Sequence, residues 1–310
     1  MKPTILAVLI PVFAARLPAQ LVAIDPGALP LSDTSRMELS GFLRGQQWLE
    51  AETALYRSVR ENPASAELRK ALAAAHFRNE RYLAAATEYG RAARMAPLDP
   101  GSRFTLAAAY IALERRHWAR RELESLAAEY PRNPLYPHWL AGIYQHYQWF
   151  DRAIVESRKA IEINPDFSSA HDRLGQCLEA LGRTAEALAA YAKAEQVGRA
   201  AGERSAWPSY HRGSLLRQGG KFEEAVAALE RAAALEPRNA EVQHELGLTL
   251  DRLNRPDEAL AALRVAVEAE PGEAKFHYAL SRLQRRTGDI DGARASLARF
   301  QRLAGGEAGR

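Results

Sequence analysis

The residues that could support chemistry in this chain are eight histidines and one cysteine, Cys177. Imidazole nitrogens and thiolates are common zinc ligands, bases and nucleophiles in proteins. His138 and His146 lie eight residues apart, which is too far along one helix for both to hold the same ion. His211 and His244 could approach each other from successive helices, but no carboxylate or cysteine completes a ligand set at the usual spacing. We expect no metal site.

Catalysis by Cys177 would need a nearby base. His171 is six residues away, which places it on another face of the same helix. The chain carries no CxxCH, no glycine-rich phosphate loop, no HExxH and no GxSxG motif. A single cysteine cannot form an intramolecular disulfide. We therefore expect neither an enzyme activity nor a cofactor.

The elements that carry these residues recur with a period of 34 residues. Prolines mark the period in two series, the first being Pro63, Pro97, Pro131 and Pro165, the second Pro237 and Pro271. The two series are 72 residues apart, which is two periods plus four. Four additional residues must therefore lie between them, and the segment around 198–205 accommodates them.

The segment 240–273 shows the repeating unit most clearly. Its apolar residues fall at three- and four-residue steps, as the buried stripe of a helix requires, first at Val242, Leu246, Leu250 and Leu253 and then at Leu260, Leu263 and Val267. Pro256 lies between the two runs, and proline suits the first turn of a helix. Each unit is thus predicted to be a pair of helices, which must be buried against neighbouring pairs.

The order Leu246, Gly247, Ala259, Leu263 and Pro271 within this period resembles the tetratricopeptide repeat, a helix-turn-helix unit. The resemblance extends from about Ser32 to about Leu303. It implies an all-α fold, a right-handed α-solenoid of about eight helix-turn-helix repeats.

The resemblance also divides the chain. Repeats one to five occupy residues 32–205, with the four-residue insertion near 198–205, and repeats six to eight occupy residues 206–303. The insertion either lengthens the second helix of repeat five or loosens the loop after it. Residues 20–31 form a linker, and residues 304–310 a flexible tail.

Residues 1–19 have the anatomy of a secretory signal peptide. A basic start at Lys2 precedes an apolar core from Ile5 to Ala15, and small or turn-prone residues follow. We place cleavage after Ala19, which predicts a secreted or periplasmic protein. The core is shorter than the roughly 20 residues that span a bilayer, so a retained anchor is the less favoured alternative.

The charge gives no argument for nucleic acid as a partner. The formal net charge is +4, from 42 basic and 38 acidic residues, and both signs alternate along the predicted helices. Removal of residues 1–19 would take away Lys2 and Arg16, which lowers the net charge to +2.

In tetratricopeptide arrays the first helices of the repeats line a concave groove, and the resemblance implies binding residues at positions two, five, six, nine, twelve and thirteen of each repeat. From these positions we select His138, Trp139, Gln145, His146, Arg173, Gln176, Trp207, Tyr210, His211, Arg217, His244, Asp251, Arg252, Tyr278, Arg282 and Arg285. The early repeats carry Ala74, Phe77, Phe104, Ala108 and Ile111 there, which either form an apolar end of the groove or pack between hairpins.

These features favour a non-catalytic scaffold that binds a peptide or protein segment in the groove, within a bacterial-type envelope or periplasm. The alternative is recognition of a glycan or peptidoglycan through Trp139, Trp207 and Tyr210, as an accessory to a polysaccharide enzyme system. The carboxylate-clamp variety of these repeats uses asparagine in the groove, and none of the groove positions here is asparagine.

Overall fold

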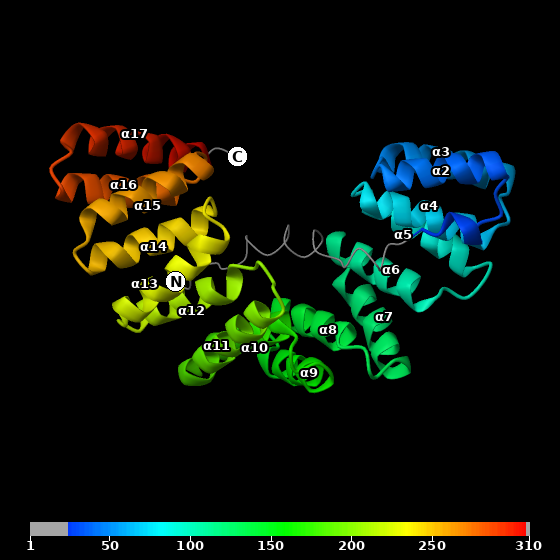
Figure 1. Ribbon diagram of the computed structural model, residues 1–310, viewed down its shortest axis with the longest axis horizontal. Coiled ribbons are helices and arrows are strands. Elements are labelled where there is room, and N and C mark those ends of the chain that lie inside the picture. Colours follow the sequence, from blue (N-terminus) through cyan, green and yellow to red (C-terminus); the bar gives the residue numbers. More distant parts are fainter. Residues whose placement is uncertain (1–23, 308–310) are drawn as a thin grey trace. The chain divides into compact units, whose positions relative to one another are not determined.

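A computed structural model describes residues 24–307. In this range the chain is entirely helical, with sixteen α-helices, one 3₁₀ helix and no strand. The α-helices form eight consecutive pairs (Figure 1). Their bounds are α2 Asp33–Arg44, α3 Trp48–Glu61, α4 Ala66–Arg78, α5 Tyr82–Ala93, α6 Pro100–Ala112, α7 Arg116–Glu129, α8 Leu135–His146, α9 Phe150–Ile163, α10 Ser168–Ala180, α11 Thr184–Ala200, α12 Trp207–Gln218, α13 Phe222–Leu235, α14 Ala240–Arg252, α15 Pro256–Ala269, α16 Ala274–Arg286 and α17 Ile290–Glu307. The predicted all-α solenoid of about eight helix-turn-helix repeats is confirmed.

The chain divides into two compact units, one up to Ile143 and one from Tyr144 onward, so that the division lies inside α8. In the first unit, Leu39, Leu55 and Leu72 of successive helices form a shared core. In the second unit, Leu229, Leu263 and their neighbours from α13 to α16 do the same. Each pair of helices therefore buries its apolar stripe against the next pair, as the spacing of the leucines predicts.

The turn between the two helices of each pair contains one residue with a left-handed backbone. These residues are Gln46, Glu80, Glu114, Gln148 and Asn254, with φ between 53° and 59°, and Gly182, Gly220 and Gly288, with φ between 73° and 88°. They follow each other at intervals of 34 residues except for one interval of 38, between Gly182 and Gly220. The backbone thus repeats the period of the prolines and places the four additional residues between these two turns.

The additional residues lengthen a helix. The second helices α9, α13 and α15 each contain 14 residues, whereas α11 contains 17 and ends at Ala200. Gly202 then adopts a φ of 70°, and the Glu203 N–H donates to the Gly198 carbonyl at 2.9 Å, which closes the helix end. The segment that follows, 201–206, is also longer than the four residues between α13 and α14 or between α15 and α16, so the insertion lengthens both the helix and the loop after it.

Glycine allows the two helices of a pair to approach closely in the second unit. A Cβ on Gly175 would lie 2.5 Å from the Tyr191 ring, and one on Gly213 would lie 2.6 Å from Leu229 Cγ. A Cβ on Gly247 would likewise lie 2.7 Å from Leu263 Cγ. A residue without a side chain is therefore required where the large side chain of the second helix crosses the first.

Both ends of the described chain extend the helical array. Pro26–Ala28 form a 3₁₀ helix, and the buried Leu29 packs into the core of the first repeat, so this part of the predicted linker is attached to it. At the other end α17 continues through residues 304–307, which the sequence assigns to a tail. The predicted signal segment, residues 1–19, lies outside the described residues. Within residues 24–307 no helix has the length and apolar character needed to cross a membrane.

Candidate binding surface

The first helices of the second unit form one surface. Helices α10, α12, α14 and α16 contact each other in this order, and Gln145 near the end of α8 contacts Gln176 of α10. We call the side chains that these segments carry at the predicted binding positions the first-helix surface. Of the sixteen residues selected from the sequence, twelve lie on α10 to α16, and Gln145 of α8 contacts α10 directly. The other three, His138, Trp139 and His146, lie on α8.

A chain of polar contacts crosses from α8 to α10. Arg173 Nη1 donates to Gln145 Oε1 at 2.8 Å, and Gln145 Nε2 donates to Gln176 Oε1 at 2.8 Å. Gln176 Nε2 in turn donates to Asp172 Oδ2 at 2.9 Å. The structure thus brings together three predicted residues, but their polar groups bind each other across the repeat boundary.

The contacts continue from α10 to α12 through a histidine. His211 Nδ1 donates to Asp172 Oδ1 at 2.8 Å, and its ring stacks on Trp207 with centroids 5.8 Å apart. Burial alone would lower the pKa of His211, but the Asp172 charge and the hydrogen bond to it outweigh burial and raise that pKa. Tyr210 contacts the same imidazole edge-on. His211 is therefore the centre of an ion-paired aromatic cluster.

A second set of ion pairs joins α12, α14 and α16. Arg217 Nε lies 2.7 Å from Glu245 Oε2, Lys275 pairs with Glu241, and Arg286 pairs with Asp251. The selection from the sequence missed Glu245. Its place in its repeat is the same as that of Arg173 and His211, so the position rule alone would have found it.

His244 lies between these ion pairs and behaves unlike His211. Its ring packs against Phe276 with centroids 5.0 Å apart. Burial, together with the positive charges of Lys275 and Arg217, lowers the pKa of His244 to about 4. Because no carboxylate is bound to this imidazole among the described residues, it stays neutral at physiological pH.

The remaining residues of the second unit are open to solvent. Arg252, Tyr278, Arg282 and Arg285 are exposed on α14 and α16, and the Tyr278 side chain has 45% of its surface accessible. The Arg282 guanidinium lies over the Tyr278 ring at 5.9 Å. His146 is exposed at the end of α8, beside the ring of Tyr147. The exposed side chains of α14 and α16, namely Arg252, Tyr278, Arg282 and Arg285, are accessible to a partner.

His138 and Trp139 are placed differently, because both are buried in the first unit. Trp139 retains 6% of its surface and packs edge-on against Phe104 at 5.2 Å. Phe104 and Phe77 are also buried, with Ala74 and Ala108, so these side chains pack between hairpins. Ile111 is half-buried.

Cys177, the candidate nucleophile, lies in the second unit. Cys177 is buried, and burial raises the pKa of its thiol to about 11, so the thiol is protonated at neutral pH. Residues 24–307 contain no cluster of three or more histidine, cysteine or carboxylate side chains suited to a metal ion.

The chain matches known families and folds over most of its length. A family model described as tetratricopeptide repeat matches residues 37–102, 210–274 and 244–308, and a second model of the same description matches residues 166–238. Together the matches span more than half of the chain. No curated protein matches the sequence.

Several solved structures share the fold at low identity. Yeast Tom70 superposes with a TM-score of 0.66 at 15% identity, covering 94% of this chain and 64% of Tom70. A tetratricopeptide repeat protein from Parabacteroides merdae gives 0.64 at 16% identity, covering 81% of this chain and 98% of that one. The pilF protein of Pseudomonas aeruginosa gives 0.50 at 22% identity, with 55% and 76% covered. At these identities the likeness concerns the fold.

Proposed function

Because this chain belongs to the tetratricopeptide repeat family, whose members serve protein–protein interaction, we propose that it binds an acidic peptide segment of a partner protein. The binding site is the exposed part of the first-helix surface, on α14 and α16. The observation that carries this proposal is that the other charged residues of the first-helix surface are mostly paired between neighbouring helices, as far as Asp251 with Arg286, whereas Arg252, Arg282 and Arg285 are exposed and unpaired.

The open residues have the chemistry of a recognition site. Arg252, Arg282 and Arg285 are exposed cations, and no carboxylate of the described chain forms an ion pair with them. Tyr278 supplies a rigid apolar face among them. Tyrosine and arginine are the residue types that most often contribute large shares of binding energy at interfaces. An extended segment with acidic and apolar side chains complements this surface.

The paired residues support the site without joining it. Arg217 with Glu245, and His211 with Asp172, link neighbouring helices. A ligand that used these groups would first have to break partly buried ion pairs, which is costly. We therefore assign them to fixing the spacing of α10, α12 and α14, so that the residues after them are held in place.

The glycan alternative has less support. Of its three aromatic residues, Trp139 is buried against Phe104, while Trp207 and Tyr210 are half-buried and pack edge-on against each other at 5.5 Å. Stacking on a sugar needs an open ring face. Tetratricopeptide repeat proteins are in general non-catalytic scaffolds, and we propose no catalytic step for this chain.

The peptide proposal is tested by selection from a random displayed peptide library against the purified chain. We expect the selected peptides to be rich in aspartate and glutamate. Affinity for the best of them should fall by about tenfold or more in Tyr278→Ala/Arg282→Ala, since each lost interface anchor contributes at least ~1 kcal/mol. Added salt should weaken binding as well, because the attraction is electrostatic.

Arg264→Ala on α15 is the matched control, because Arg264 is also an exposed arginine but lies on a second helix. Its affinity should equal that of the wild type. Enrichment of peptides without acidic residues, or equal affinities of Tyr278→Ala/Arg282→Ala and the wild type, would contradict the proposal.

We further propose that residues 1–19 direct export, so that the chain acts in the periplasm or outside the cell. The basic start and apolar core of this segment support the proposal. In a bacterial host, the exported protein is expected to begin at Gln20 on N-terminal sequencing. Ile10→Arg should keep the full-length chain in the cytoplasm, whereas Lys2→Arg should be exported normally. Exported protein that retains residues 1–19 would indicate an anchor instead.

A further inference from the structure

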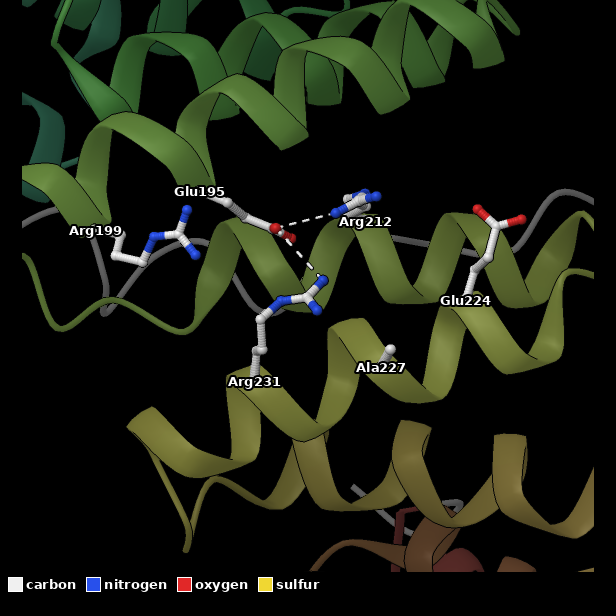
Figure 2. A pocket seen from close by; sticks show the side chains of 6 residues that line it. All are labelled: Glu195, Arg199, Arg212, Glu224, Ala227 and Arg231. Carbon is white, nitrogen blue, oxygen red and sulfur yellow. Dashed lines mark hydrogen bonds and ion pairs between the residues drawn. The ribbon is translucent and has the colours of Figure 1, made fainter.

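A pocket of about 370 Å³ opens on the second unit between α11, α12 and α13. Figure 2 shows its lining, Glu195, Arg199, Arg212, Glu224, Ala227 and Arg231. None of these is among the residues assigned to the peptide. The pocket is therefore a separate site, whose chemistry is dominated by three guanidinium groups from three helices.

One carboxylate serves two of these arginines. Arg212 Nη1 donates to Glu195 Oε2 at 3.1 Å, and Arg231 Nη2 lies 3.5 Å from the same oxygen. Each guanidinium has five N–H groups, so most of those on Arg212 and Arg231 remain available. The bridging Glu195 holds both arginines in position but neutralises only one of their two charges.

Arg199 adds a third positive charge. It is exposed, and in Figure 2 it lies on the α11 side of the pocket, whereas the Glu195 carboxylate is directed toward Arg212 and Arg231. Within residues 24–307 its side chain forms no hydrogen bond or ion pair. Glu224, at the other side of the pocket, lies 3.3 Å from Lys221 and is thereby balanced. The end of the pocket around Glu195 consequently carries an excess of positive charge, from guanidinium groups on three helices.

The insertion in repeat five supplies this third arginine. The second helices α9, α13 and α15 have 14 residues, and Arg199 lies on the three residues by which α11 exceeds that length. The Gly202 turn and the Glu203 N–H bond to Gly198 hold the extension in place. The insertion thus has a second effect besides lengthening the period. It adds Arg199 to the pocket that Arg212 and Arg231 line, where both of these arginines pair with Glu195.

The arrangement selects among anions. A planar carboxylate is matched by a single guanidinium fork, whereas a phosphate group has three outer oxygens that can accept from donors in several directions. The pocket also has room for a small group attached to the phosphate. We propose that this pocket binds the phosphate group of a small phosphate monoester, through Arg199, Arg212 and Arg231.

Isothermal titration calorimetry with inorganic phosphate and with ribose 5-phosphate tests the proposal on the purified chain. Both probes are expected to bind, while ribose should not, and acetate should bind more weakly than phosphate. Arg199→Gln/Arg231→Gln should weaken both phosphate probes by about tenfold or more, because each charge-assisted hydrogen bond lost is worth over ~1 kcal/mol. Tighter binding of ribose 5-phosphate than of inorganic phosphate would identify an ester as the ligand.

Two further variants distinguish phosphate binding in this pocket from a nonspecific effect of the net charge of the protein. Glu195→Gln removes the competing carboxylate and should bind phosphate more tightly than the wild type, by about threefold or more, since two guanidinium groups are released. Arg294→Gln, an exposed arginine on α17, should leave affinity unchanged. The proposal is overturned if phosphate does not bind, if acetate binds equally well, or if Arg199→Gln/Arg231→Gln retains wild-type affinity while melting normally.

Discussion

Replacing Gly247 with valine is expected to destabilise the second unit by about 3 kcal/mol, the upper end of the usual cost of overpacking a core. Any Cβ at this position would lie 2.7 Å from Leu263 Cγ and 3.2 Å from the Ala259 carbonyl oxygen. Leu263 is almost fully buried, and the carbonyl belongs to a helix, so neither can move freely. Valine adds a branched side chain, and α14 and α15 would have to separate.

The experiment is chemical denaturation followed by circular dichroism, with Gly90→Val as the matched control. Gly90 also lies inside a helix, α5, but nothing lies within 4 Å of the place a Cβ would take. Valine is a slightly better helix former than glycine, so the control should stay within about 0.5 kcal/mol of the wild type. Gly247→Val should be less destabilising in a Leu263→Ala background than in the wild type, because the side chain that it meets is then absent. Equal stabilities of Gly247→Val and Gly90→Val would refute the close-packing explanation.

The second large effect concerns acid stability. The pKa of His244 is about 4 in the folded chain, against an ordinary value of 6.5. Between these values the unfolded state binds more protons, so the stability that neutral His244 contributes is present above pH 6.5 and is lost as the pH falls toward 4. The loss should amount to about 2–3 kcal/mol. His244→Gln, which does not titrate, should lack this contribution.

Comparison of wild type and His244→Gln at each pH isolates this histidine from the carboxylates, which both proteins share. The stability difference between them should change steadily between pH 6.5 and 4, in the direction that disfavours the wild type in acid. His211 should show the opposite sign, because its pKa is raised: the stability from its pair with Asp172 is present below 6.5 and disappears as the pH rises through the raised value. A difference between wild type and His244→Gln that does not depend on pH would exclude a buried neutral imidazole at this position.

The fold could be predicted from the sequence because the features that specify it are local and repeated. The proline series, the leucine spacing and Gly247 each reflect a contact within a hairpin or with its immediate neighbour. The same period reappears in the left-handed turn residues, which include Glu80 and Asn254 as well as glycines. In five of the eight repeats this left-handed turn residue is not a glycine, so a search for glycine alone would not find every repeat.

The binding surface was only partly predictable, because a position in a repeat does not tell what lies opposite it. Trp139 and Tyr278 were selected by the same rule, yet Phe104 covers the first while the second is exposed. Arg217 and Arg285 likewise hold the same position, but only Arg217 meets a glutamate in the next repeat. Whether a charged side chain is paired depends on the residue that faces it from the neighbouring repeat. For Arg217 this residue is Glu245, 28 residues further along the chain.

The pocket could be predicted from the sequence even less than the binding surface. Arg199, Arg212 and Arg231 lie on three different helices, and each alone is an ordinary surface arginine. Their convergence depends on how far α11 extends before it ends. The period reveals four additional residues, but it does not reveal whether they are helical, and only the helical form places Arg199 beside Glu195.

The pairing between first helices also makes the order of the repeats matter. Arg173 of repeat five contacts Gln145 of repeat four, and Glu245 of repeat seven contacts Arg217 of repeat six from the same position. If repeat six were deleted, Glu245 would face Glu179, and two carboxylates would meet where an ion pair stood. Repeats five to seven therefore cannot be shuffled, duplicated or removed as interchangeable units, although their hydrophobic frames are nearly the same. The charged residues of neighbouring repeats therefore specify the order in which the repeats follow each other.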